Sequence, residues 1–136
     1  MSLSRIARAI VMGLLTMLVL TGPVLAQAPT TPWVAPPAEK AKKNPLANDT
    51  KAIEQGEKVA KINCVSCHGT GGKGDGAAAV ALNPKPADWT SSRVQDEADG
   101  ELFWKISNGR GAMPPWKHLP ENDRWAAIRY IRSLKK

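Results

Sequence analysis

Two cysteines and a histidine within five residues, Cys64-Val65-Ser66-Cys67-His68, constrain this chain more than any other feature. Cys-x-x-Cys-His is the attachment pattern of c-type haem, because two thiols three positions apart can add across the two vinyl groups of one porphyrin edge. The histidine that follows is then held at the iron as the proximal ligand. The pattern therefore predicts one haem c, bound covalently through Cys64 and Cys67, with His68 on the metal.

A Cys-x-x-Cys pair alone also fits a thioredoxin-like redox pair or half of a zinc site. A redox pair belongs to a βαβ setting, and a tetrahedral zinc site needs two further Cys or His ligands. The chain has two cysteines, and its only histidine besides His68 is His118. The second half of a zinc site is missing from the sequence, so we favour haem attachment.

Residues 1–28 are typical of a secretory signal peptide. Arg5 and Arg8 give a basic start, and the apolar run over residues 10–20 is shorter than the roughly 20 residues of a membrane-spanning helix. Cleavage is expected near Ala26 or Ala28. The alternative is an uncleaved anchor that tethers the protein to the membrane. Either way we expect an exported, periplasmic protein, since haem is attached to this motif outside the cytoplasm.

The charge of the chain favours protein partners. The formal net charge is +7, and loss of Arg5 and Arg8 with the signal segment would leave +5. Such an excess suits transient redox proteins that present an acidic docking surface. Nucleic acid is not expected as a partner, because no groove-reading motif is present. The lysines expected to surround an exposed haem edge are Lys58, Lys61, Lys73, Lys105 and Lys117.

The remaining chain divides at about residue 49. Residues 29–48 are rich in Pro, Ala and Lys and predict a flexible lead, although Trp33 is unusual in a linker. Residues 49–136 predict one small domain with helices over about 51–63, 100–107 and 120–134. No stretch alternates as a strand. We therefore expect an all-α domain with three main helices and long loops around a haem.

Met113 is the only methionine beyond the signal segment, and it lies in the Gly- and Pro-rich loop 109–116. A lone methionine on a helix is usually core filler, but a thioether in a stiff loop suits metal ligation. Met113 is therefore the expected second axial ligand of the iron. His118 or an open iron site are the alternatives. Ligation by His and Met raises the haem potential and suits electron transfer.

The order of these features resembles class I c-type cytochromes, most closely the short bacterial monohaem domains that serve oxidases and dehydrogenases. The resemblance covers roughly residues 51–134. It rests on Gly56, Cys64 to Gly69, the loop Gly72 to Gly76, Pro84 to Asp88, Asn108-Gly109, Met113-Pro114 and the ending Ala127 to Leu134.

The resemblance implies roles for single residues. Gly56 would let the first and last helices cross closely, with Tyr130 at the crossing. Pro84 would accept the N–H of His68 through its carbonyl, with Pro86 as the competitor. Ala60 departs from the family, which often has an aromatic there, so Trp125 or Trp104 would fill the space.

Trp89 and Arg110 complete the predicted haem site. Trp89, like Trp104 and Trp116, could line the haem pocket or be ordinary core. Arg110 could pair with a haem propionate or stay solvated.

The expected function is that of an exported monohaem carrier, not an enzyme, that shuttles single electrons between redox partners. The alternatives are a haem subunit tightly bound to a dehydrogenase or oxidase, and an open-site haem sensor or peroxidase.

Overall fold

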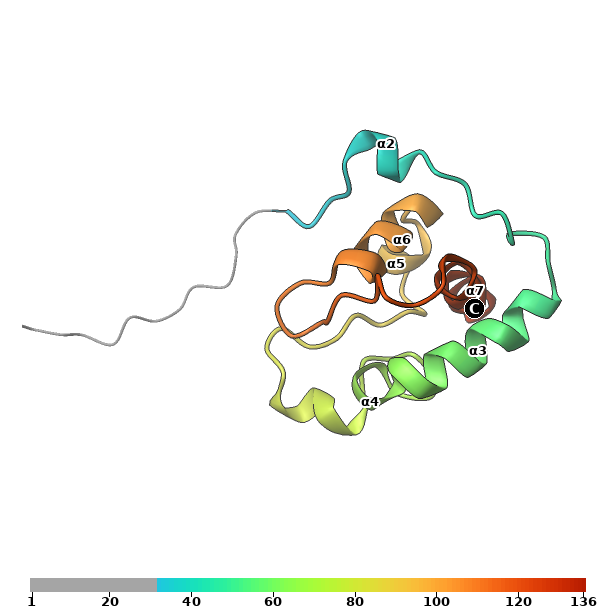
Figure 1. The fold of residues 1–136 in the computed structure, drawn as a ribbon. Helices are drawn as coiled ribbons and strands as arrows, with labels where there is room; N and C mark the ends of the chain where they lie inside the picture. Colours follow the sequence, from blue (N-terminus) through green and yellow to red (C-terminus); the bar gives the residue numbers. More distant parts are fainter. Residues whose placement is uncertain (1–31) are drawn as a thin grey trace, which may run out of the picture. The chain divides into compact units, whose positions relative to one another are not determined.

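The computed structural model describes residues 32–136, and the predicted signal peptide lies outside the described residues. Long loops join six α-helices and one 3-10 helix in this part of the chain (Figure 1). No strand occurs between residues 32 and 136, where the only sheet-like pairing is an isolated bridge between Arg110 and Met113. The helices are α2 (Pro37–Lys40), α3 (Lys51–Asn63), α4 (Val65–His68), η1 (Ala77–Ala81), α5 (Ser92–Gln95), α6 (Asp99–Asn108) and α7 (Glu121–Ser133). The all-α prediction is confirmed.

The three predicted helices correspond to α3, α6 and α7. The backbone N–H of Lys51 donates to Oδ1 of Asp49 at 2.8 Å, so Asp49 caps the start of α3. Ala98 precedes α6, and Asp99 is its first residue. The Asp99 carboxylate pairs with Arg132 of α7 at 2.8 Å. Gly109 ends α6, with a φ of +62° that a residue with a side chain rarely adopts.

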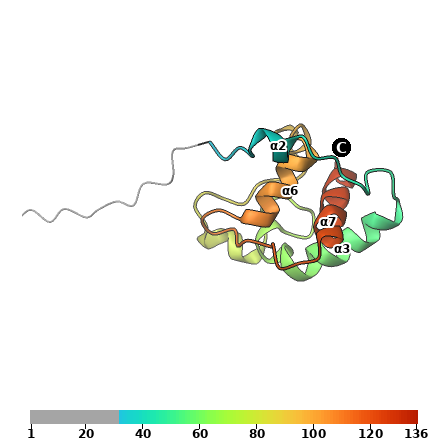
Figure 2. The same ribbon diagram turned by 45° about the horizontal axis from the view of Figure 1, so that its top comes forward.

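Helices α3 and α7 pack against each other (Figures 1 and 2). Their crossing lies at Gly56, as the family resemblance implies. A Cβ atom on Gly56 would lie 2.5 Å from the carbonyl carbon of Ala126 and 2.9 Å from Cβ of Tyr130. Any side chain at this position would therefore push the helices apart. The close approach explains why a glycine is kept in the middle of a helix, where it costs about 1 kcal/mol relative to alanine.

The core lies around the start and middle of α7. Ile128 is fully buried, and the rings of Phe103 and Trp125 stack with centroids 3.9 Å apart. Ala60 belongs to the same buried cluster as Trp125, whereas Trp104 is only half-buried. Of the two tryptophans predicted to pack near Ala60, Trp125 is the one that shares its core.

Residues 32–48 pack against the helical domain, so the prediction of a flexible lead is wrong for them. We call them the N-terminal arm. Gly100 of α6 sits under this arm, where a Cβ atom would lie 2.8 Å from the carbonyl oxygens of Lys40 and Lys42. The buried Asn44 donates from Nδ2 to the carbonyl of Trp125 at 3.1 Å. The compact unit accordingly starts at Pro32 and not at residue 49.

Charged groups hold the arm on α6. Lys40 lies 3.1 Å from the carboxylate of Glu101, whose side chain is 6% exposed. Lys105 approaches the same carboxylate to 3.3 Å and Glu97 to 2.5 Å, and its Nζ stands 5.5 Å from the ring centre of Trp33. The Pro- and Ala-rich composition of the arm suggests a segment that buries little surface. Small residues and the nearly buried carboxylate of Glu101 are nevertheless enough to hold the arm in place.

Across residues 32–136, no helix has the length and apolar character needed to cross a membrane.

Candidate haem site

The two cysteines and His68 lie in a single helical turn directly after α3. The carbonyl of Cys64 accepts the backbone N–H groups of Cys67 at 3.1 Å and of His68 at 2.9 Å. This turn, Cys64 to His68, is called the attachment turn below. Both thiols are free and half-buried. The local fold therefore brings two thiols and one imidazole to the same short segment.

The Cys64 thiol is not activated as a nucleophile. Burial, together with the neighbouring Cys67, raises its pKa to about 11, so it is protonated at neutral pH. Reactive redox cysteines show the opposite, a lowered pKa. Within residues 32–136, no three His, Cys, Asp or Glu side chains come together to hold a metal ion. Both observations disfavour the redox-pair and zinc alternatives.

The imidazole of His68 is oriented by a backbone carbonyl. Its Nδ1 lies 3.0 Å from the carbonyl oxygen of Ala87. The prediction that Pro84 accepts this N–H is therefore wrong, and so is its competitor Pro86. The carbonyl of Pro86 lies against Gly74 instead, and the next carbonyl along the chain, that of Ala87, reaches His68.

This hydrogen bond leaves Nε2 of His68 as the nitrogen that can bind a metal. Burial lowers the pKa of His68, and the bond to Ala87 opposes that shift only in part. The ring is therefore neutral at neutral pH, which is the form that ligates iron.

The indole ring of Trp89 packs directly on the imidazole ring of His68. The two rings stack with centroids 4.6 Å apart and planes inclined by 22°. The indole is buried. The backbone N–H of Trp89 donates to the carbonyl of Gly72 at 2.6 Å, and the side-chain amide of Gln95 donates to the Trp89 carbonyl at 2.7 Å, so the backbone of Trp89 is fixed. Trp89 therefore helps to position the predicted ligand, and its predicted direct contact with haem stays a prediction.

Met113 sits at the end of a tight turn. The backbone N–H of Arg110 donates to the Met113 carbonyl at 2.9 Å, and the Met113 N–H donates back to Arg110 at 3.0 Å. Gly109 makes room for this turn, since a Cβ atom there would lie 2.5 Å from the carbonyl carbon of Pro114. At the other end of the loop, the backbone N–H of Trp116 donates to the carbonyl of Ile106 at 3.0 Å. The loop thus holds the half-buried Met113 in a fixed backbone position.

The main chain of Arg110 takes part in the Met113 turn, whereas His118 lies at the surface. Arg110 closes the Met113 turn through its main chain, and pairing of its side chain with a propionate stays a prediction. His118 is exposed beside Trp116, with ring centroids 5.5 Å apart. This placement agrees with a surface role for His118.

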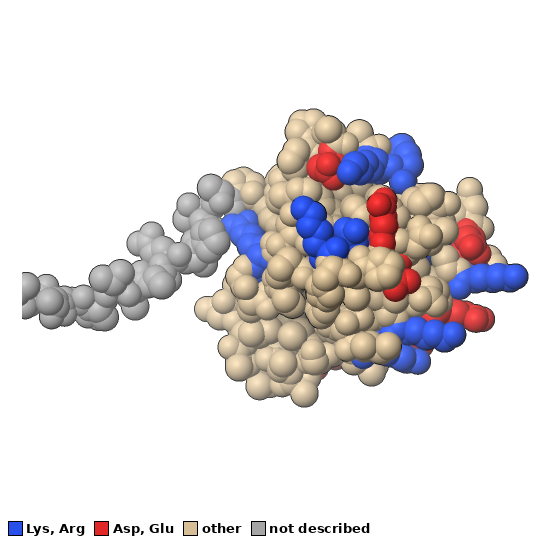
Figure 3. All heavy atoms as spheres, in the orientation of Figure 1, with Lys and Arg blue, Asp and Glu red and all other residues tan. Residues whose placement is uncertain are grey.

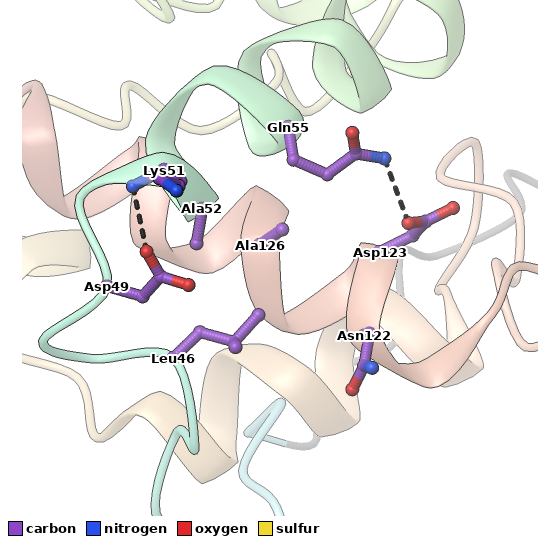
Figure 4. Close-up of a pocket in the computed structure, with 8 residues that line it drawn as sticks. All are labelled: Leu46, Asp49, Lys51, Ala52, Gln55, Asn122, Asp123 and Ala126. Atoms are coloured by element: carbon purple, nitrogen blue, oxygen red, sulfur yellow. Dashed lines mark hydrogen bonds between the residues drawn. The ribbon is translucent and has the colours of Figure 1, made fainter.

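A pocket of about 330 Å³ opens between the end of the arm and helices α3 and α7 (Figure 4). Its polar groups are engaged with one another: Asp49 binds the N–H of Lys51, and Gln55 donates to Asp123 at 3.1 Å. None of the predicted haem-binding residues lines it. The lining residues are Leu46, Asp49, Lys51, Ala52, Gln55, Asn122, Asp123 and Ala126.

The residues present fit a covalently bound haem. Two free thiols lie in one turn, a neutral imidazole has Nε2 left for iron, and a thioether is held in a separate stiff loop. Sequence reasoning missed Ala87, because a carbonyl acceptor carries no side-chain signal. It also missed the stacking of Trp89 on His68.

Comparison with known proteins agrees with this site. Residues 51–131, which include the attachment turn and Met113, match the family described as cytochrome c oxidase, cbb3-type, subunit III. The chain belongs to this family. It is therefore a c-type cytochrome domain of class I type, which implies covalent haem c and a role in electron transfer.

Two relatives place this cytochrome domain in context. The cbb3-type cytochrome c oxidase subunit FixP of Bradyrhizobium diazoefficiens is 39% identical over 82 residues, which are 59% of this chain and 27% of FixP. The chain thus spans about a quarter of that relative. A chain of the Kuenenia stuttgartiensis reducing HAO-like protein complex is similar in structure, with a TM-score of 0.58 and 27% identity over 64% of this chain and 45% of that one.

Proposed function

We propose that this cytochrome is an exported carrier that holds one haem and passes single electrons between redox proteins, without catalysing a substrate reaction of its own. The attachment turn carries the proposal, because it joins two free thiols to an imidazole whose Nδ1 is already bonded to Ala87. The sequence contains two cysteines, enough for one attachment. Export rests on the predicted signal peptide over residues 1–28 and implies the periplasm.

In this proposal His68 and Met113 would hold the haem iron. When bound, haem supplies an iron that accepts and releases one electron. His68 is held by Ala87 and Trp89, and Met113 by the hydrogen-bonded turn with Arg110. Two ligands held in this way would stay in place when an electron is gained or lost, so the reorganisation that accompanies electron transfer would be small.

The test is an optical spectrum of the ferric protein, matured with haem in a bacterial periplasm, followed by a redox titration. A low-spin spectrum with a weak far-red sulfur-to-iron band and a positive potential is the expected result. A high-spin ferric spectrum that shifts on addition of cyanide would mean an open iron site. The proposal would then fail, and a haem sensor or peroxidase would be the better description.

A second candidate is a haem subunit held permanently in an oxidase or dehydrogenase. It is favoured by the matched family and by FixP, whose name is that of an oxidase subunit. Size-exclusion chromatography of a native periplasmic and membrane extract separates the two. Elution of the haem with a single small protein, no larger than the 14.6 kDa of the full chain, supports the free carrier, whereas co-elution with a large complex supports the subunit.

A further inference from the structure

Arg124 of α7 carries a charge that the haem site described above does not use. Figure 3 shows Lys and Arg side chains that stand out from the surface, several of them beside an Asp or Glu. Arg124 is instead buried, with a relative exposure of 9%. No carboxylate among residues 32–136 forms an ion pair with it. A buried charge without a counter-ion costs free energy, so other contacts must compensate for it.

The two acids of α7 that lie closest to Arg124 in the sequence are engaged elsewhere. Glu121 accepts the indole N–H of Trp125 at 3.2 Å, and Asp123 accepts the amide of Gln55 at 3.1 Å. The Nε of Arg124 is buried and has no acceptor within the described part of the chain. The contacts that this part of the chain does supply to the guanidinium come from α6, which packs against α7.

These contacts lie in the second half of α6. Nη1 of Arg124 donates to Oγ of Ser107, and the guanidinium carbon stands 4.5 Å from the ring centre of Phe103. The Ser107 hydroxyl in turn donates to the carbonyl of Phe103 at 2.7 Å, so its oxygen is free to accept from Arg124. A cation is favoured near the C-terminal end of a helix and over an aromatic ring. The contacts therefore compensate for the buried charge and tie α7 to the last turn of α6.

The last turn of α6 is also the base of the Met113 loop. Gly109 directly follows the last residue of α6, and the loop returns to this helix where the N–H of Trp116 donates to the carbonyl of Ile106 at 3.0 Å. The loop thus leaves α6 and comes back to it within two residues of Ser107. Arg124 holds the point at which both ends of the loop are fixed.

We propose that Arg124 is a positioning residue for Met113: it holds the last turn of α6 against α7 and so keeps the thioether in place for the iron. The inference rests on the proposed function, in which His68 and Met113 would hold the haem iron. Helix α7 can serve as the fixed side of this link, because Asn44 of the arm donates to the carbonyl of Trp125 at 3.1 Å. Without the guanidinium, the base of the Met113 loop would lose its link to α7, and the thioether would leave the iron more often.

Cyanide binding to the ferric holoprotein tests the proposal, because cyanide must take the place of Met113. The apparent affinity for cyanide rises with the fraction of molecules in which the thioether has left the iron. Arg124→Met should lower the apparent dissociation constant of cyanide about tenfold, since tenfold corresponds to about 1.4 kcal/mol, the order of one hydrogen bond to a charged group. The far-red sulfur-to-iron band of the same variant should weaken.

Arg129→Met is the matched control. Arg129 also lies on α7, and its Nε is likewise buried without an acceptor within residues 32–136. The hydrogen bond to Ser107 and the stacking on Phe103 belong to Arg124 and not to Arg129. The control removes the same charge from the same helix, so a general effect of charge would appear in both variants. Its cyanide affinity should match that of the unchanged protein.

Equal dissociation constants for cyanide in Arg124→Met and Arg129→Met would overturn the proposal. So would a loss of unfolding free energy in Arg124→Met with an unaltered far-red band and cyanide affinity, because Arg124 would then serve the fold alone. If Arg124→Met does not fold around haem, Ser107→Ala carries the test. It keeps the charge and removes the acceptor, and it should shift the cyanide affinity in the same direction by a smaller factor. No shift in Ser107→Ala would then overturn the proposal.

The spectrum of the unchanged ferric protein separates this proposal from the carrier function. A low-spin spectrum with the far-red band, together with equal cyanide affinities in the two arginine variants, overturns the role of Arg124 and leaves the carrier standing. A high-spin spectrum without the band would mean that Met113 is not on the iron, which overturns the carrier function and the role of Arg124 with it.

Discussion

The Nδ1 atom of His68 lies 3.0 Å from the carbonyl oxygen of Ala87, so the attachment turn is tied to the loop that precedes α5. The acceptor is the main-chain carbonyl of Ala87. A substitution at position 87 keeps this carbonyl, and it breaks the hydrogen bond only if it moves the backbone. Trp89, two residues later, stacks on the same imidazole. One short stretch of chain therefore sets both the direction of Nε2 and the packing of the ring.

Met113→Ala tests the second axial ligand. The two cysteines remain, so covalent haem should be retained, while loss of the thioether should lower the reduction potential and remove the far-red band. A redox titration and a ferric spectrum measure both effects.

His118→Ala is the control for the Met113 variant, because His118 is exposed and stands beside Trp116. Its potential should match that of the unchanged protein. A potential that changes with His118 and not with Met113 would reverse the ligand assignment.

Replacement of Cys64 and Cys67 by serine tests covalent attachment. The double variant should retain no haem after denaturation, and each single variant should keep a haem held by one bond in reduced yield. Mass spectrometry and haem staining of a denaturing gel detect the difference. Ser66→Ala, an exposed change between the two cysteines, should leave haem content unaltered. Covalent haem in the double variant would contradict the site.

Gly56→Ala tests the crossing of α3 and α7. The added Cβ would lie 2.5 Å from the carbonyl carbon of Ala126, and overpacking of this kind costs about 1–3 kcal/mol, more than alanine gains in helix propensity. The free energy of unfolding of the holoprotein in guanidinium chloride measures the loss. Gly71→Ala is the matched control, since its nearest neighbour, Cγ of Lys73, is 4.0 Å away. Equal stability of the two variants would show that the helices can separate without cost.

Lys40→Ala tests the ion pairs under the arm. Burial on its own would raise the pKa of Glu101, but hydrogen bonds and charge from Lys40 and Lys105 outweigh it and hold that pKa below its usual value. Ionised Glu101 therefore stabilises the fold above its unfolded pKa of about 4.3, and this stability is lost as the pH falls through the folded pKa. Without Lys40 the folded pKa should rise, so acid unfolding should begin at a higher pH.

Circular dichroism followed from pH 7 to pH 2 measures this shift. The loss of stability at pH 7 should be about 0.5–1 kcal/mol, because Lys40 is half exposed. Lys42→Ala is the control, as Lys42 pairs with Glu39 and not with Glu101. If both variants unfold at the same pH as the unchanged protein, the arm does not depend on Glu101.

Sequence patterns predicted the long helices well and the arm poorly. The apolar positions of α3 and α7 repeat with the helical period, and this signal survives without any knowledge of the fold. The arm has no such period. Its order comes from Asn44, which binds a carbonyl of α7, and from main-chain contact with Gly100, and both depend on tertiary neighbours that a local pattern does not contain.

The site divides in the same way. Cys64, Cys67 and His68 could be predicted because their chemistry requires those side chains at that spacing. The acceptor of the His68 N–H could not, because every residue has a carbonyl and the backbone path alone decides which one points at the ring. The choice of Pro84 followed residue type, whereas the structure uses the direction of the chain at Ala87.

The crossing of Gly56 with Ala126 also sets an order of events during biosynthesis. Helix α3 finds its partner only in α7, the last helix of the described chain, so a polypeptide that has emerged as far as the attachment turn has no packed partner for α3. A chain cut short before α7 would lack the helix against which Gly56 of α3 packs.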